Sequence, residues 1–130
     1  MKLVAACATD IHGKTYIDRH FGNAETYAIY QISQERFEYI TSLPNTSEEE
    51  RVHADPKKAG SISKILKEAH VQILIAKKFG PNIVRVKKHF IPIIVNVAPI
   101  EEGLQKVMEN FDMILNELHK GEKRKHLVLK

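Results

Sequence analysis

Three short apolar runs most constrain what this chain can fold into. They are Leu3–Ala8, Val71–Ala76 and Ile91–Val97. A continuous apolar run of this length, without polar alternation, is typical of a strand that is covered on both faces of a sheet. Parallel strands need a crossover between them, so we expect the three runs to lie parallel at the centre of one sheet with helices as the connections.

An antiparallel hairpin is predicted between the first two of these runs. Tyr27–Ser33 and Arg36–Ser42 are rich in Tyr, Ile and Phe, and only Gln34 and Glu35 separate them. Two β-prone runs joined by two residues form a hairpin. We therefore expect this hairpin to extend one edge of the sheet.

Three helices are predicted to accompany the strands. The first begins at Asp55 and Pro56, which suit the cap and the first position of a helix. The second follows Gly80-Pro81-Asn82 and the third follows Pro99. The third is the clearest, because its apolar residues keep one continuous stripe until Gly121 ends it. The stripe consists of Ile100, Leu104, Val107, Met108, Phe111, Leu115 and Leu118.

The order of these elements predicts an α/β fold. We expect a mixed sheet of about five strands, with three parallel central strands and an antiparallel hairpin edge, and about three helices. One domain is predicted over residues 1–119, followed by a basic C-terminal tail over residues 120–130. The lone Cys7 excludes an intrachain disulfide and fits a reducing cytoplasm, and no segment approaches a membrane span.

The net charge of +4 originates in this tail. Residues 120–130 hold five Lys or Arg and one Glu, so 15 residues of each sign remain from the 20 basic and 16 acidic residues of the chain. A neutral body does not form a broad phosphate-binding face. We therefore expect no nucleic-acid partner and no membrane partner.

The segment from Asp18 to Ala24 is the best candidate for a site. It combines His20, whose imidazole can bind metal or move protons near neutral pH, with Arg19 and Gly22. Ligands of parallel sheets gather outside the carboxyl ends of the strands, and this segment follows the first of those ends. The structural alternative is a loop staple, in which His20 and Phe21 pack and Gly22 supplies a turn with positive φ into the next strand.

Two further groups of residues belong to the same predicted edge. Lys77 and Lys78 stand just before the second helix, and their ammonium groups favour an anion there. Cys7 would offer a thiolate beside His12 and His20, a donor set that suits a soft transition metal or the iron of a sulfide cluster. The alternative for Cys7 is a buried, inert side chain.

Enzymatic interpretations find less support. Gly13-Lys14-Thr15 matches only the end of a phosphate-binding loop, because Ala8 stands where the pattern requires glycine. Asp10, Asp18 and Glu25 would suit a hard divalent ion, as a nuclease needs, but none lies inside a predicted strand. We therefore expect a protein that is not an enzyme.

The chain resembles the dinitrogenase iron-molybdenum cofactor biosynthesis family in element order over Leu3–Phe111 and in three short motifs. The motifs are His20-Phe21-Gly22-Asn23-Ala24, Tyr27-Ala28-Ile29-Tyr30 and Gly80-Pro81-Asn82. The resemblance implies a ribonuclease-H-like fold and a non-catalytic carrier of iron-sulfur or iron-molybdenum cofactor precursors. It also implies cluster-assembly or acceptor proteins as partners.

The predicted cofactor site follows from this resemblance together with the residue chemistry. The resemblance implies His20, Phe21 and Gly22, with Gly80 contributing its backbone. The residue chemistry makes His20 the metal ligand with Cys7 as a second ligand. Arg19 and Lys77 would neutralise the charge of the cluster.

The sequence also allows a second function, which differs from that of a carrier. The family often has glycines, sometimes with a cysteine, where this chain has Ala76-Lys77-Lys78-Phe79. A protein-interaction or regulatory domain of the same fold, one that has lost cluster binding, would fit this departure. Glu48–Glu50 and the basic tail would then contact a partner.

Overall fold

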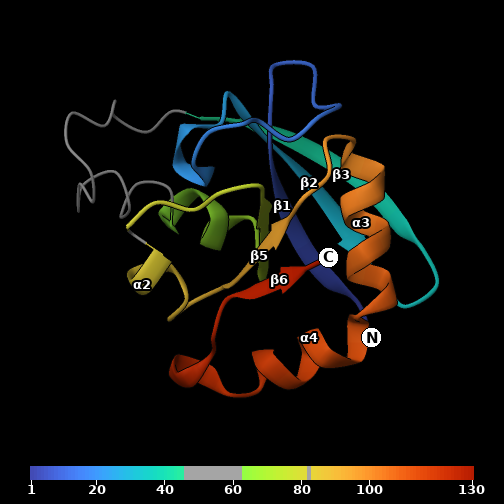
Figure 1. Cartoon of the computed structure of the whole chain (residues 1–130), viewed down its shortest axis with the longest axis vertical. Coiled ribbons are helices and arrows are strands. Elements are labelled where there is room, and N and C mark those ends of the chain that lie inside the picture. The colour runs from blue at the N-terminus through green and yellow to red at the C-terminus, as the bar shows by residue number, and fades with distance from the viewer. Residues whose placement is uncertain (46–62, 82) are drawn as a thin grey trace.

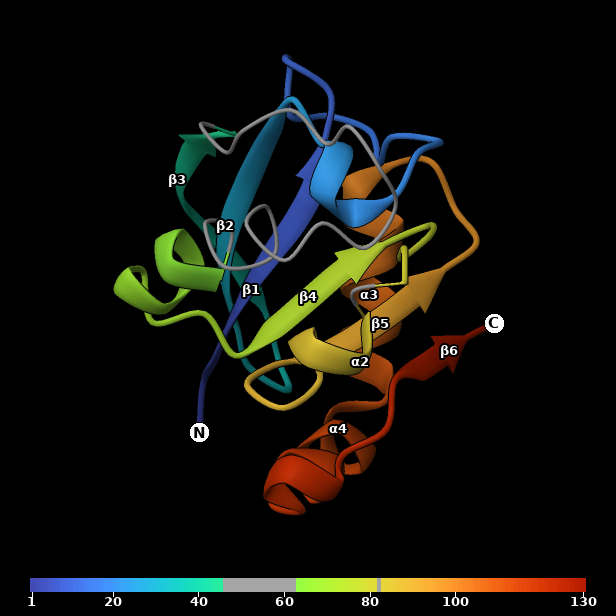
Figure 2. The same cartoon turned by 90° about the vertical axis from the view of Figure 1, so that its left-hand side faces the viewer.

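The computed structural model describes residues 1–45, 63–81 and 83–130, and Figures 1 and 2 show the arrangement of its elements. Its strands form a single six-stranded sheet in the order β3-β2-β1-β4-β5-β6. The strands are β1 (Leu3–Thr9), β2 (Thr26–Ile32), β3 (Phe37–Pro44), β4 (Ile73–Ala76), β5 (Ile91–Val95) and β6 (Leu127–Leu129). The α-helices are residues 63–68, α2 (Ile83–Val86), α3 (Ile100–Glu109) and α4 (Phe111–Leu118), and the 3-10 helices are η1 (Phe21–Asn23) and η2 (Gly121–Lys123).

The pairing of the strands confirms the predicted α/β fold with a mixed sheet. β1, β4 and β5 are parallel neighbours, with Cys7 opposite Ile75 and Ile75 opposite Ile93. β2 and β3 extend the β1 edge as an antiparallel hairpin. The predicted start of the first helix at Asp55 and Pro56, and the acidic Glu48–Glu50, lie outside the described residues.

Both faces of the central strands are buried, as their apolar sequences require. Successive side chains of β1 alternate between two cores, so Cys7 belongs to the core under α3 and α4 while Ala6 belongs to the core on the other face. The second core also contains Phe21 and Leu66. A strand covered in this way has no polar positions, which explains the continuous apolar run.

The sheet gains a sixth strand that the sequence analysis did not include. β6 lies within the residues predicted as a basic tail and pairs in parallel with β5. Leu129 is 3% exposed. The carboxylate of Glu117, itself buried, accepts hydrogen bonds from the backbone N–H of Lys125 at 2.9 Å and from Lys120 Nζ at 3.0 Å. The short apolar sequence of β6 therefore pairs with β5, although the residues before it are basic.

The predicted single long helix is two helices that meet at Asn110 (Figure 1). Asn110 has φ −115° and ψ 23°, which is not a helical conformation. Its side-chain Nδ2 donates to the carbonyl of Lys106 at 2.8 Å. An asparagine side chain that bonds to a nearby carbonyl competes with the helical backbone pattern, so the chain changes direction here while the apolar stripe continues.

His70 adopts a backbone conformation that favours glycine. It follows the helical residues 63–68 with φ 60°, and its N–H donates to the carbonyl of Lys67 at 3.0 Å. A residue with a side chain in this left-handed conformation lowers the free energy of unfolding by about 1 kcal/mol relative to glycine. We therefore expect His70→Gly to raise the free energy of unfolding by about that amount in urea titration. Gly121→Ala is the matched reverse change, because Gly121 has φ 62°, and it should lower stability.

Candidate functional site

The segment between β1 and β2 closes the carboxyl edge of the parallel strands. It forms bridges from Thr15 to Pro99 and from His20 to Lys78. The N–H of Phe21 donates to the carbonyl of Lys78 at 2.9 Å. Figure 2 shows η1, drawn in light blue, next to the arrowheads of β1 and β4. The structure thus brings the segment from Asp18 to Ala24 next to Lys78, one of the two lysines that we predicted at this edge.

The imidazole ring of His20 lies close to the backbone of Gly80. The imidazole is half-buried and lies so close to the Gly80 backbone that a Cβ added there would be 2.9 Å from Nδ1. A real Cβ atom is essentially never found at that separation from its neighbour, so any side chain here would displace the imidazole. Gly80 therefore belongs to this edge through its backbone, because it leaves room for the ring of His20.

Phe21 anchors the segment to the core. Its side chain is 4% exposed and stacks on Phe79 with ring centroids 5.3 Å apart. The ring of Tyr27 lies 4.9 Å away, and the Tyr27 hydroxyl donates to the carbonyl of Phe21 at 3.0 Å. Phe21 thus packs as the loop-staple interpretation predicts, whereas the neighbouring His20 stays at the edge of the sheet. The positive φ that this interpretation assigns to Gly22 is wrong, because Gly22 lies inside the 3-10 helix η1.

Two cations of this edge, Lys77 and Arg19, are paired with carboxylates. Lys77 Nζ lies 2.7 Å from Asp18 Oδ1, and the hydrogen bond and positive charge of Lys77 hold the pKa of Asp18 below its ordinary value. The side chain of Lys77 is 21% exposed and that of Asp18 is 84% exposed. Arg19 lies 3.7 Å from Glu25, and both side chains are about half exposed. The edge therefore carries positive side chains beside carboxylates, and in the pair of Lys77 and Asp18 the carboxylate is the more exposed partner.

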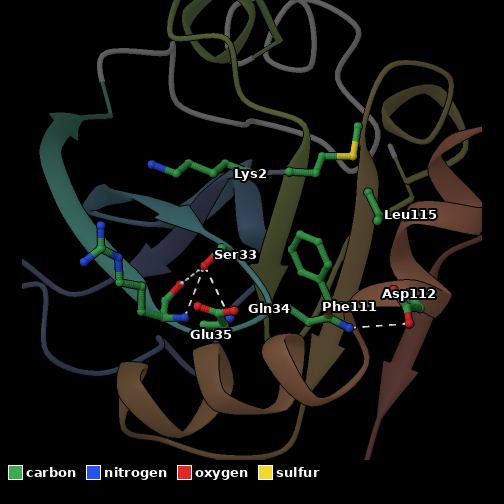
Figure 3. A pocket seen from close by; sticks show the side chains of 9 residues that line it. Lys2, Ser33, Gln34, Glu35, Phe111, Asp112 and Leu115 are labelled. Atoms are coloured by element: carbon green, nitrogen blue, oxygen red, sulfur yellow. Dashed lines mark hydrogen bonds between the residues drawn. The ribbon is translucent and has the colours of Figure 1, made fainter.

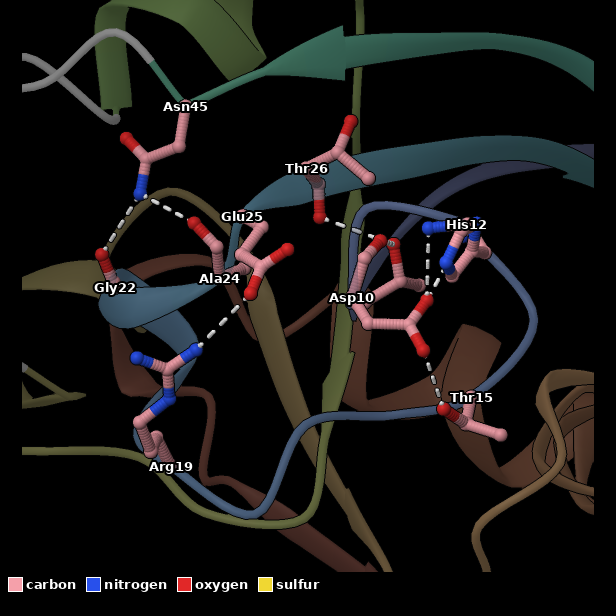
Figure 4. A network of polar contacts seen from close by, with 11 residues as sticks. Asp10, His12, Thr15, Arg19, Gly22, Ala24, Glu25, Thr26 and Asn45 are labelled. Atoms are coloured by element: carbon pink, nitrogen blue, oxygen red, sulfur yellow. Dashed lines mark hydrogen bonds and ion pairs between the residues drawn. The ribbon is translucent and has the colours of Figure 1, made fainter.

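Asn45 holds the site segment from the end of β3, and the sequence analysis missed it. Its Nδ2 donates to the carbonyls of Gly22 at 3.0 Å and Ala24 at 2.8 Å (Figure 4). In the sequence Asn45 stands in a polar connection, where asparagine usually indicates only a turn. Nothing in that local pattern indicates that β3 ends next to η1, because the pairing of the strands decides it.

The three acidic candidates do not form one group. Asp10 accepts hydrogen bonds from the N–H of His12 and Gly13 and from the Thr15 hydroxyl, all within its own turn (Figure 4). Desolvation raises the pKa of Asp10, but these hydrogen bonds outweigh it and the pKa lies below its ordinary value. Within residues 1–45, 63–81 and 83–130, no three His, Cys, Asp or Glu side chains come close enough to hold a metal ion.

Cys7 lies apart from His20. Its side chain is fully buried in the core under α3, whereas Phe21, next to His20, belongs to the core on the other face. Burial raises the pKa of the Cys7 thiol to about 12. The thiol is 3.9 Å from the Tyr16 hydroxyl. His12 is exposed in the Asp10 turn, so the structure does not bring the three predicted soft ligands together.

A cavity of about 470 Å³ lies at the other end of the sheet (Figure 3). It is lined by the turn between β2 and β3, by the N-terminal residues and by α4. Several of its polar groups bond to one another, since Ser33 Oγ accepts from the N–H of Arg36 and Gln34 Nε2 donates to Asp112 at 3.4 Å. None of the predicted site residues lines this cavity.

The fold and the closed carboxyl edge define a small α/β domain with a histidine, a close glycine backbone and paired charges at the place where such sheets bind ligands. The family model for the dinitrogenase iron-molybdenum cofactor matches residues 1–110. The chain therefore belongs to this family, which confirms the resemblance seen in the sequence. None of the curated proteins compared with the chain matches it.

Membership associates the chain with the iron-molybdenum cofactor of dinitrogenase, and so with cofactor biosynthesis for nitrogen fixation. The family is one of cofactor-binding or carrier domains. No helix in the described part of the chain is long and apolar enough to cross a membrane.

Proposed function

We propose that this protein is a non-catalytic carrier of an iron-sulfur or iron-molybdenum cofactor precursor, which it holds at the edge formed by His20, Gly80 and Lys77. The observation that carries the proposal is the half-buried imidazole of His20, seated against Gly80 where the parallel strands end. Family membership supports the class of cargo. Phe21 and Gly22 would shape the backbone on one side of that cargo.

The donor set suits a cluster that arrives as cargo. An imidazole nitrogen is a ligand that iron accepts, and Lys77 and Arg19 add positive charge for an anionic metal-sulfur cluster. One protein ligand supplemented by charge binds less permanently than a cage of several ligands. Weak attachment of this kind suits a carrier, because a carrier must release its cargo. Cys7 is not part of this set, since its thiol is buried in the other core.

Release would take place to acceptor or cluster-assembly proteins, which we propose as the partners. The Arg19 and Asp18 side chains are 57% and 84% exposed, so the edge faces solvent. A cargo held there would be accessible to a second protein without unfolding of the domain. Transfer would then be an exchange of ligands between two proteins, with no catalytic residue required.

Removal of the His20 imidazole should abolish most cluster binding. We expect His20→Ala to bind at least about fivefold less iron per chain than the wild type after anaerobic reconstitution with iron and sulfide, because the only proposed ligand is lost. Iron content and visible absorbance are the measurements. Gly80→Ala retains every donor atom but displaces the ring, so it should also lose iron.

His126→Ala provides the matched control for this experiment. His126 is an exposed histidine just before β6, and its removal should leave the iron content unchanged. Equal iron in the wild type and in folded His20→Ala would place the cargo elsewhere. A well-folded wild type that binds no iron would contradict the carrier and favour the interaction or regulatory domain, which needs no cluster.

A further inference from the structure

We infer that Asp18 is the internal counter-ion that an anionic cargo must displace from Lys77, so that the site selects ligands with two or more negative charges. This inference rests on the proposed function and adds the charge class of the ligand. It concerns one ion pair at the carboxyl edge of the sheet, between a lysine that directly follows β4 and an aspartate in the segment that crosses over it.

The two partners of this ion pair differ in freedom. The Lys77 side chain is 21% exposed and is carried by the residue next to β4, whereas the Asp18 side chain is 84% exposed. The backbone nearby is held by the bridge between His20 and Lys78. Asp18 can therefore swing into solvent while the ammonium group of Lys77 stays at the edge. Displacement requires a change of one exposed side chain and no rearrangement of the fold.

Exchange of ions at Lys77 depends on the charge of the incoming ligand. A monoanion replaces one negative charge by another, so the Coulomb energy of the ammonium group hardly changes. A dianion interacts about twice as strongly at the same distance, so its interaction with the ammonium group exceeds the one that is lost with Asp18. Lys78 adds further positive charge, since it also contributes to the low pKa of Asp18. The wild-type site should therefore discriminate between anions of equal shape and unequal charge.

Tetrathiomolybdate and tetrathioperrhenate test this discrimination, because both are tetrahedral metal-sulfur anions and they carry two charges and one charge, respectively. Dissociation constants would be measured anaerobically by equilibrium dialysis at constant ionic strength. We expect the wild type to bind the dianion at least about tenfold more tightly than the monoanion. Asp18→Asn should tighten the binding of both by about two- to fivefold, because the competing carboxylate of an exposed ion pair is gone.

Asp112→Asn is the matched control, since it makes the same change of net charge beside Gln34, in the cavity that none of the site residues lines. Unchanged binding in this variant, together with tighter binding in Asp18→Asn, supports the inference. An equal increase in anion affinity in Asp18→Asn and Asp112→Asn would show that net charge alone causes the effect, and it would overturn the inference. Unaltered affinity in Asp18→Asn, or no binding of either anion by both wild type and Asp18→Asn, would also overturn it.

Failure here is distinguishable from failure of the proposed function. The carrier is judged by reconstituted iron in the wild type and in His20→Ala, whereas the counter-ion is judged by the two anions in Asp18→Asn. One outcome separates the two. If the wild type binds iron, His20→Ala loses it, and Asp18→Asn binds both anions as the wild type does, then the carrier function is supported and the role of Asp18 is rejected. Binding that appears only in Asp18→Asn would support the counter-ion directly.

Discussion

Replacement of Phe21 by alanine should lower the free energy of unfolding by about 3–4 kcal/mol. The side chain is 4% exposed and contacts the rings of both Phe79 and Tyr27. Its removal would leave a cavity between the site segment and the sheet, and the two aromatic neighbours would lose their contacts. Chemical denaturation followed by circular dichroism measures the change.

Phe37→Ala is the control for the loss of Phe21. Phe37 is also a phenylalanine in an aromatic pair, with the ring of Tyr30 6.0 Å away, but it is only partly buried at the start of β3. We expect Phe37→Ala to lower the free energy of unfolding by about 1 kcal/mol, because Phe37 buries less apolar surface than Phe21 does. Equal losses in the two variants would show that Phe21 does not anchor the site segment as the packing indicates.

Replacement of Gly103 by alanine should destabilise the protein by about 2 kcal/mol, although alanine is the better helix former. Gly103 lies in α3, and a Cβ there would be 2.6 Å from Cε2 of Tyr16. The ring of Tyr16 cannot withdraw easily, because it is 3% exposed and its hydroxyl lies 3.2 Å from the carbonyl of Ile100, to which it donates. Thermal unfolding of the variant measures the effect.

A double variant separates this steric effect from helix propensity. Tyr16→Leu shortens the side chain that the new methyl group would meet. In that background Gly103→Ala should cost much less than it does in the wild type, or even stabilise the helix. An unchanged cost in the Tyr16→Leu background would contradict a clash between α3 and the segment that crosses the strand ends.

Much of the fold was predictable because its signals are local. The apolar runs of β1, β4 and β5 reflect burial on both faces, and the hairpin of β2 and β3 follows from two β-prone runs separated by Gln34 and Glu35. The break at Asn110 was not predictable from periodicity, because the apolar stripe continues through it. β6 was missed because the charges of the preceding residues dominate the composition of that segment.

The candidate site stays a prediction, and the structure brings only some of its predicted members together. The rule that ligands gather at the carboxyl ends of parallel strands places His20 and Lys77 at one edge, and the bridge between His20 and Lys78 brings their segments together. The positioning of Gly22 and Ala24 by Asn45 depends on where β3 ends in space. The local sequence around Asn45, or around Gly22 and Ala24, does not predict this contact.

The sequence by itself determined the strands β1 to β5 and their parallel or antiparallel directions, because hydrophobic periodicity and chain connectivity control these features. It also predicted the edge at which a ligand would bind. Only the tertiary structure decided which residues meet there. Cys7 and His20 both belong to segments at the carboxyl edge, yet alternation along β1 turns Cys7 into the core under α3. The same packing seats His20 against Gly80 and pairs Lys77 with Asp18. Contacts of this kind join residues far apart in the chain, and the pairing of strands and the packing of side chains decide them.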